Sequence, residues 1–349
     1  MTEPAKGREK FMAKRKRAGL RTAVMLGLIC AALGGRAWAA GTLVPMGTAV
    51  GIQMNTDGVL VVDTTDVETC DGGCASPARD AGIRPGDIIT EISGRATGTA
   101  ADLAEAAAEL PEGPASVTVE RGGETLRLDL TPVQSAEGPR LGLWLRDGVA
   151  GVGTLTYYDP ETGRFGALGH GVTDSQTATM LPLSSGSVSP ARIVDIQPGA
   201  AGCPGALSGL FDMSAPVGTI ERNTLCGIFG TMDAAVDGGQ ALPVASDSEI
   251  CAGPAYILSS VTDGGVSRYS VEISRGMAGA QGLMLNLRVT DETLLALTGG
   301  IVQGMSGSPI IQDGKLVGAV THVLVSDASR GYGISIESML AADAMDMAA

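Results

Sequence analysis

The sequence has few aromatic residues, a shortage of basic ones and only two histidines. Aromatic residues make up 3% of its 349 residues, and 24 lysines and arginines stand against 38 aspartates and glutamates, for a net charge of −14. This balance argues against nucleic acid as a partner, because phosphate binding needs a basic surface. No cluster of cysteine and histidine offers a set of metal ligands, so we expect neither a metal nor another cofactor. Chemistry that needs a histidine must use His170 or His322.

Long apolar runs are also missing. Basic residues crowd the first 21 positions, and an apolar run over residues 23–33 follows them. That run is shorter than the roughly 20 residues that a transmembrane helix needs. Together with the small residues at 37–40, it predicts that residues 1–40 are a basic N-terminus with a signal or membrane anchor. We expect the rest of the chain outside the cytoplasm, since the basic end stays inside. Cleavage after Ala39 or Ala40 and retention as an anchor are both open.

The cysteines do not form an obvious disulfide framework. Cys30 lies in the leader, and the remaining five are an odd number, so they cannot all pair within one chain. Cys70 and Cys74 are close enough in sequence for a small disulfide in an oxidising compartment. Free or locally paired loop cysteines are the simpler interpretation. The other three are Cys203, Cys226 and Cys251.

Residues 44–133 have the pattern of one small α+β domain. A short apolar strand at 58–62 precedes a one-turn helix and another strand within residues 76–92. An alanine-rich helix at 100–110 ends at Pro111, and alternating strands follow at 116–121 and 124–130. The 51 glycines of the chain favour such turns and short strands. We therefore expect this segment to form a domain separate from residues 140–349.

The string SPARDAGIRPGDIITEISG, residues 76–94, resembles PDZ domains. PDZ domains bind an extended peptide as an added strand at a sheet edge and often capture its carboxylate with backbone N–H groups. The resemblance implies a peptide-binding loop at residues 48–54, with Val50, Gly51 and Ile52 at its centre, although the wording differs from the usual G-L-G-F. The alternative is a module that only spaces or docks the next domain.

Residues 140–349 carry many short apolar strands separated by glycine turns, which predicts an all-β barrel or sandwich. The clearest chemical signal is Gly-Met-Ser-Gly-Ser-Pro at 304–309, followed by a hairpin with Asp313-Gly314 as its turn. It lacks both the last glycine and the following helix of the G-x-S-x-G elbow. It resembles the nucleophile region of chymotrypsin-like peptidases, which implies Ser306 as nucleophile. The N–H groups of Gly304 and Ser306 are then candidates for an oxyanion hole.

A serine hydroxyl needs a base to become nucleophilic near neutral pH. His170 lies between two glycines in a loop, a poor place for a structural histidine, and we assign the base to it. His322 lies in or just after a strand on the far side of the hairpin, where it is either an ordinary strand residue or a substrate contact. For a third member of a triad, Asp291 and Asp174 compete. Asp291 fits the chain order His, Asp, Ser, and we favour it as the triad acid, the alternative being the N-cap of a short helix. A Ser–His dyad is the remaining alternative.

Three long strings, residues 151–174, 218–232 and 298–340, resemble SpoIVB sporulation peptidases. So does the layout of basic N-terminus, membrane segment, PDZ domain and serine peptidase domain. The resemblance implies a mainly β chain, with a PDZ-like α+β domain before an all-β chymotrypsin-like peptidase domain. The family's serine, histidine and proposed aspartate fall on Ser306, His170 and Asp291.

The same resemblance implies a membrane-anchored serine endopeptidase of sporulation signalling. It would act in the space between forespore and mother-cell membranes, on itself near its N-terminus and on a regulatory membrane protein bound in part through the PDZ domain. That cleavage would trigger sigma-factor processing. Two alternatives are a PDZ scaffold with an inactive peptidase-like domain and a general extracytoplasmic quality-control protease.

Overall fold

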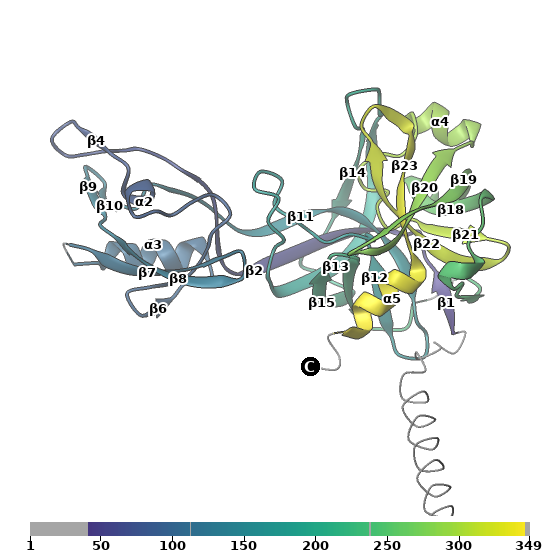
Figure 1. Cartoon of the computed structure of the whole chain (residues 1–349), viewed down its shortest axis with the longest axis horizontal. Coiled ribbons are helices and arrows are strands. Elements are labelled where there is room, and N and C mark those ends of the chain that lie inside the picture. The colour runs from purple at the N-terminus through teal and green to yellow at the C-terminus, as the bar shows by residue number, and fades with distance from the viewer. Residues whose placement is uncertain (1–40, 112, 237–238, 346–349) are drawn as a thin grey trace, which may run out of the picture. The chain divides into compact units, whose positions relative to one another are not determined.

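The computed structural model describes residues 41–111, 113–236 and 239–345 (Figure 1). The described residues from Thr42 onward form one compact unit, whereas the expected leader, residues 1–40, lies outside the described residues. None of the helices in these described ranges is long and apolar enough to cross a bilayer. The chain is mainly β, as the sequence predicts.

Strands make up most of the described structure, with a few short helices between them. The strands are β1 (Thr42–Pro45), β2 (Ala49–Thr64), β3 (Val67–Glu68), β4 (Cys74–Ala75), β5 (Ile88–Ile92), β6 (Arg95–Ala96), β7 (Ala115–Arg121), β8 (Glu124–Leu130), β9 (Val133–Ser135), β10 (Gly138–Arg140), β11 (Leu143–Tyr158), β12 (Arg164–Ala167), β13 (Leu183–Gln197), β14 (Ala206–Phe211), β15 (Gly218–Thr224), β16 (Gly227–Met232), β17 (Leu242–Pro243), β18 (Gly253–Thr262), β19 (Gly265–Gly279), β20 (Gly282–Val289), β21 (Pro309–Gln312), β22 (Lys315–Leu324) and β23 (Asp327–Ser335). The helices are α2 (Pro77–Asp80), α3 (Ala100–Ala108), α4 (Glu292–Thr298), α5 (Ile336–Met345) and a 3₁₀ turn, η1 (Asp247–Glu249).

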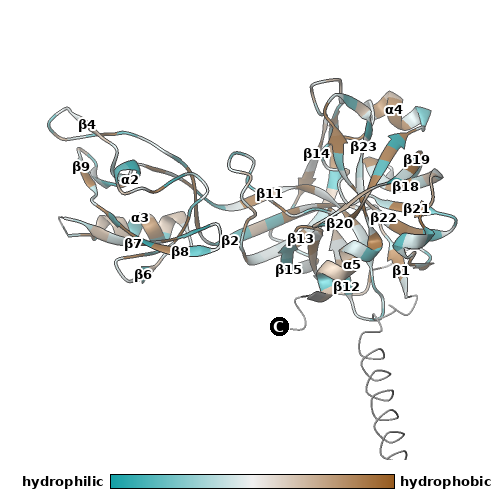
Figure 2. Ribbon diagram, in the orientation of Figure 1, coloured by the Kyte–Doolittle hydropathy of each residue, from teal (hydrophilic) through white to brown (hydrophobic). Residues whose placement is uncertain are grey.

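Six strands close into a first barrel. The pairings run β11–β12–β16–β15–β13–β2, and β2 pairs with β11 to complete the ring. Inward-facing apolar residues such as Phe165, Val188 and Ile228 fill it and are fully buried. The alternation of side chains along each strand lets one face pack inside while the other meets solvent. Apolar stretches along the barrel strands appear brown in Figure 2.

A second closed barrel follows in the order β18–β19–β20–β23–β22–β21. Its core includes Leu285, Ile310 and Val320, each fully buried. The predicted hairpin turn is confirmed: Asp313 and Gly314 take positive φ values of 50° and 75° between β21 and β22. Such φ values suit a two-residue turn with aspartate and glycine. The loop before β21 carries Ser306, and the two barrels together match the chymotrypsin-like expectation.

The PDZ-like module is inserted into the first barrel and does not precede it. Its sheet contains the second half of β2 with β5, β7 and β8, and its core packs α3 against that sheet. The predicted helix is observed at Ala100–Ala108, begun by a capping box between Thr99 and Asp102. The predicted boundary at residue 44 differs from the structure, because β1 and the first half of β2 belong to the first barrel. One long strand thus serves both modules.

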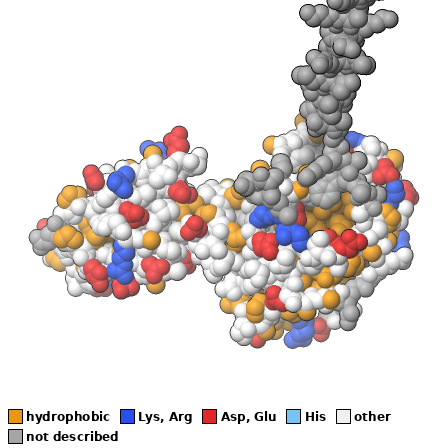
Figure 3. Space-filling view, turned by 90° about the horizontal axis from the view of Figure 1, so that it is seen from below, with side chains coloured by type: hydrophobic (Ala, Val, Ile, Leu, Met, Phe, Trp, Pro, Cys, Tyr) orange, Lys and Arg blue, Asp and Glu red, His pale blue; other side chains and the backbone are white. Residues whose placement is uncertain are grey.

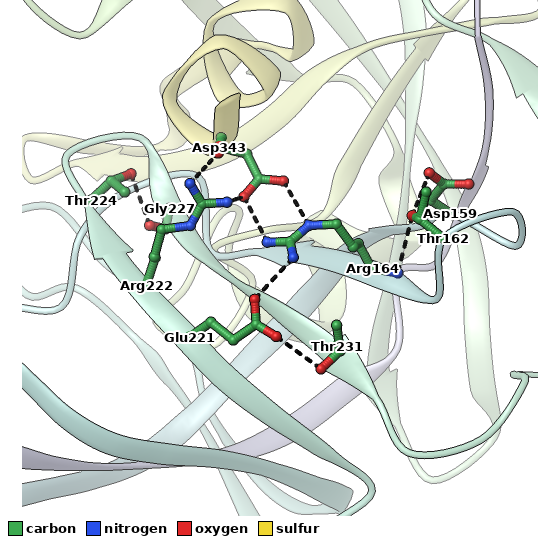
Figure 4. Close-up of polar contacts among 9 residues, drawn as sticks. All are labelled: Asp159, Thr162, Arg164, Glu221, Arg222, Thr224, Gly227, Thr231 and Asp343. Carbon is green, nitrogen blue, oxygen red and sulfur yellow. Dashed lines mark hydrogen bonds and ion pairs between the residues drawn. The ribbon is translucent and has the colours of Figure 1, made fainter. Parts of the chain in front are cut away.

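An ion-pair network holds α5 against the first barrel (Figure 4). Asp343 of α5 accepts a hydrogen bond of 3.0 Å from Arg164 of β12 and pairs closely with Arg222 of β15. Arg164 also bonds Glu221 at 2.9 Å. Burial alone would raise the pKa of Glu221, but hydrogen bonds from Arg164 and Thr231 hold that pKa below its usual range. Since β12 leads into the His170 loop, the network fixes the strand that positions that loop.

Charges of both signs share the described surface. On the face shown in Figure 3, acidic and basic side chains lie next to one another with apolar side chains between them. Exposed pairs such as Arg79–Asp66 and Arg95–Glu109 add little stability, because solvent screens them. A few large apolar side chains are also exposed, Trp144 at 64% among them.

Candidate active site

Ser306 lies in the loop between α4 and β21, where close packing demands glycine on both sides. Gly304 and Gly307 each have a φ of 97°, a conformation that other residues rarely adopt. A Cβ at Gly307 would lie 2.0 Å from the Thr154 carbonyl oxygen, so no larger residue fits there. The Ser306 hydroxyl donates a hydrogen bond of 2.7 Å to the Thr321 carbonyl in this state. The serine is therefore held in a tight loop with its hydroxyl at the surface of a cavity.

The candidate oxyanion donors, the N–H groups of Gly304 and Ser306, lie in this loop. Within the described residues, the N–H groups of Gly304 and Ser306 donate to no other atom, although their neighbours Met305 and Gly307 bond to the carbonyls of Val302 and Val320. Two unpaired N–H groups that flank a nucleophile are the donors that a developing oxyanion needs. This arrangement can stabilise negative charge next to Ser306.

His170 follows β12 in a loop that turns through two positive φ values, 69° at Leu168 and 71° at Gly169. Its ring Nδ1 lies 2.9 Å from the Gly171 carbonyl oxygen. A carbonyl can only accept, so Nδ1 carries the proton and Nε2 keeps its lone pair. Burial lowers the pKa of His170, and the Gly171 carbonyl offsets part of that effect. His170 is thus a neutral imidazole whose Nε2 can take a proton.

Ser306 and His170 line one cavity of about 490 Å³. His322 lines it too, and the two imidazole rings lie with centroids 4.7 Å apart and planes tilted by 35°. Apart from the histidines, none of the cavity residues given by the described structure is ionisable, and most are apolar, such as Ile301 and Val323. Burial and then the neighbouring His170 lower the pKa of His322. Of the two sequence alternatives for His322, the cavity position favours a substrate contact.

Asp291, the expected triad acid, lies elsewhere and has another task. One carboxylate oxygen accepts a hydrogen bond of 3.0 Å from the Leu294 N–H and the other accepts one of 3.2 Å from the Ser270 N–H. It is the N-cap of α4. Among the described contacts neither oxygen reaches His170, whose Nδ1 faces Gly171 instead. Asp291 is therefore a helix cap and not the triad acid that we expected. The Gly171 carbonyl lies at His170 Nδ1, where a triad acid would lie.

Asp174 is also not bonded to His170, but it organises the loop that carries it. Its carboxylate accepts hydrogen bonds from the backbone N–H groups of Gln176 and Thr177 and pairs closely with Arg146. Burial alone would raise the pKa of Asp174, but these hydrogen bonds and the Arg146 charge hold that pKa below its usual range. The structure thus favours the Ser–His dyad among the three sequence alternatives.

Asn223 of β15 is a site residue that the sequence reasoning missed. Its side chain accepts a hydrogen bond of 2.8 Å from the Val172 N–H and donates bonds of 2.9 Å to the carbonyls of Val172 and Leu181. These three bonds pin the loop that follows His170. The only signal in the sequence is a polar amide near the end of a strand, which is too common to assign a role.

The predicted peptide-binding edge at Val50, Gly51 and Ile52 is wrong. These residues lie in β2 and pair on both sides, with Gly51 opposite Val152 of β11 and Ser189 of β13. A strand that is paired on both edges has no free backbone groups to offer a peptide. The residues belong to the first barrel and not to the PDZ-like module.

A free edge of the PDZ-like module lies instead at the start of β11. In the part of the chain that the structure describes, Leu143 and Leu145 pair with β2 on one side only, and a cavity of about 890 Å³ lies between this stretch and α3. The cavity is lined by Leu103 and Ala107 of α3 and by Gly142, whose φ is 69°. In the sequence, the signal for this edge is the string Leu-Gly-Leu at 141–143, but that string lies beyond the domain end expected at residue 133.

Comparisons with known proteins agree with this architecture. Residues 137–340 match the family model of the SpoIVB peptidase S55, and residues 72–121 match that of a PDZ domain. A protein of Agrobacterium fabrum named as a zinc metalloprotease, Atu1380, is 34% identical over 90 residues. That match covers 26% of this chain and only 23% of the relative's length.

Among solved structures, the Rv3671c protease of M. tuberculosis is similar in two forms. Its active form has 14% identity and a TM-score of 0.31, over 56% of this chain and 73% of that one. Its inactive form has 14% identity and a TM-score of 0.30, over 56% of this chain and 82% of that one.

Proposed function

We propose, from the premise that this chain belongs to the SpoIVB peptidase S55 family, that it is an exported serine endopeptidase of sporulation signalling. The observation that carries the enzymatic part is the meeting of Ser306 and His170 in one cavity beside two unpaired N–H groups. A nucleophile, a neutral base and oxyanion donors are what acyl transfer requires.

The reaction follows from these positions. The Ser306 hydroxyl turns from the Thr321 carbonyl to His170, which takes its proton as Ser306 attacks the scissile carbonyl. The N–H groups of Gly304 and Ser306 receive the oxyanion. The imidazolium of His170, held at Nδ1 by the Gly171 carbonyl, then protonates the leaving amine. Water then attacks the acyl-enzyme by the same steps, which releases the carboxylic acid product and frees Ser306.

The protein substrate is bound in part through the PDZ-like module. An extended peptide would add as a strand to the free edge of Leu143 and Leu145, with its side chains in the groove against α3. This position replaces the one expected from sequence.

The chain works outside the cytoplasm and is membrane-associated through residues 1–40, in the space between forespore and mother-cell membranes. Its targets are a regulatory membrane protein and its own N-terminal region. The basic residues before a short apolar run and the family membership support this part of the proposal.

The test compares the wild type with Ser306→Ala. Only an activated serine reacts with a fluorophosphonate probe, so wild type should label and Ser306→Ala should not. Mass spectrometry after incubation should find cleavage in residues before the first barrel for wild type alone. Absence of labelling in folded wild type would favour the inactive scaffold. Broad cleavage of unfolded proteins would favour a quality-control protease.

A further inference from the structure

The oxyanion loop consists of four consecutive peptide units, from residue 303 to residue 307, and every carbonyl among them has a partner. The Gln303 carbonyl accepts a hydrogen bond of 2.8 Å from the Leu207 N–H, and the Met305 carbonyl accepts one of 3.0 Å from the Ser308 N–H. A trans peptide unit directs its N–H opposite to its C=O. Fixing these two carbonyls therefore aims the N–H groups of Gly304 and Ser306 the other way.

The other two carbonyls of the loop are both held by one residue of the first barrel, Thr154 in β11. Its hydroxyl donates a hydrogen bond of 2.8 Å to the Gly304 carbonyl, and its backbone N–H donates one of 3.0 Å to the Ser306 carbonyl. Thr154 is 1% exposed, so neither bond competes with water. Thr154 thus forms hydrogen bonds to the loop on both sides of Met305.

We propose that Thr154 is a positioning residue for the oxyanion hole. The Gly304 carbonyl and the Gly304 N–H belong to adjacent peptide units joined by a glycine at φ 97°. Glycine turns easily about its backbone bonds, so this joint is a point at which the loop can turn. The Thr154 hydroxyl restrains this joint at the Gly304 carbonyl, while the Met305 N–H of the same peptide unit bonds to the Val302 carbonyl at 3.1 Å. The inference rests on the proposed peptidase function and adds a residue that touches neither substrate nor the reacting atoms.

Removing the Thr154 hydroxyl should weaken binding of the transition state more than binding of the substrate. Loss of a whole oxyanion donor costs roughly 10²–10³ in kcat, and a misplacement of about 1 Å can cost about 10². A misaimed Gly304 N–H should therefore lower kcat by about 10- to 100-fold in Thr154→Val. KM should stay within about twofold, because the ground-state carbonyl makes little use of the hole.

The experiment compares Thr154→Val, Thr154→Ser and Thr156→Val with wild type in ester hydrolysis. Thr156→Val is the matched control: Thr156 lies two residues along the same strand, is fully buried, and its hydroxyl has no hydrogen-bond partner in the described structure. Thr156→Val and Thr154→Ser should keep wild-type kcat. A peptide aldehyde, whose adduct carries an oxyanion, should lose affinity for Thr154→Val in step with kcat.

Equal kcat for Thr154→Val and Thr154→Ser would overturn the inference, as would a loss that appears only in KM. If Thr154→Val does not fold, the pair Thr154→Ser and Thr154→Ala, which differ in the hydroxyl alone, gives the same comparison. Failure of the proposed function would look different, since wild type itself would then show no Ser306-dependent hydrolysis.

Discussion

Replacing Asp291 by asparagine tests whether this residue is a catalytic acid or a helix cap. A triad aspartate changed to asparagine lowers kcat by about 10⁴. A cap changed to asparagine costs little, since both residues cap well. In the structure Asp291 bonds the Leu294 and Ser270 N–H groups, and one of these bonds persists with the single amide oxygen of asparagine. We therefore expect Asp291→Asn to keep kcat within about twofold, well short of the triad loss.

The stability of the same variants checks the capping role. Asp291→Ala removes both acceptors and should cost about 0.5–2 kcal/mol, the usual value for a lost cap, with Asp291→Asn nearer to wild type. The assay is hydrolysis of a small ester, with fluorophosphonate labelling and a urea midpoint on each variant. A folded Asp291→Asn with kcat reduced 10³-fold or more would refute the reasoning and restore the triad.

Three further predictions concern pH, the C-terminal helix and the peptide groove. Because burial lowers the pKa of His170, the base is neutral at pH 7, and kcat/KM should fall to half only at a pH below the usual 6.5 as His170 takes up a proton. Asp343→Asn should lower stability by about 2–4 kcal/mol, measured by urea unfolding, because it strips largely buried Arg164 and Arg222 of a shared partner. Gly142→Ala should weaken peptide binding, measured by calorimetry, with ester hydrolysis unchanged, because a Cβ there would lie 2.6 Å from the Thr65 carbonyl oxygen at a φ of 69°.

Local patterns predicted local structure well. The alternation at 116–121 and 124–130, the alanine-rich helix at 100 and the Asp313-Gly314 turn all depend on neighbours within a few residues, and all are observed. The glycines at 304 and 307 likewise predicted a tight loop around Ser306, because a positive φ favours glycine.

Pairings between distant strands could not be predicted in the same way. The alternation of β2 is compatible with a PDZ edge and with a barrel strand, and only its pairing with β11 and β13 decides between them. Asp291 shows the same limit. Its chain position fits a triad and a cap equally, and the decision depends on where the loop of His170 comes to lie. A carbonyl partner for His170 leaves no trace in the sequence, because every residue carries one.

The insertion of the PDZ-like module gives β11 a place in both sites. Near its start, Leu143 and Leu145 form one wall of the groove, and Thr154, further along the same strand, bonds to the oxyanion loop. Between them Arg146 pairs with Asp174, which orders the loop after His170. Spatial continuity alone does not establish coupling, since that requires an element with two arrangements that both sites favour differently. The glycine joint at Gly304 is a point that can turn, because glycine has wide backbone freedom. If peptide in the groove changes kcat, we expect Thr154→Val to abolish that change and Thr156→Val to preserve it.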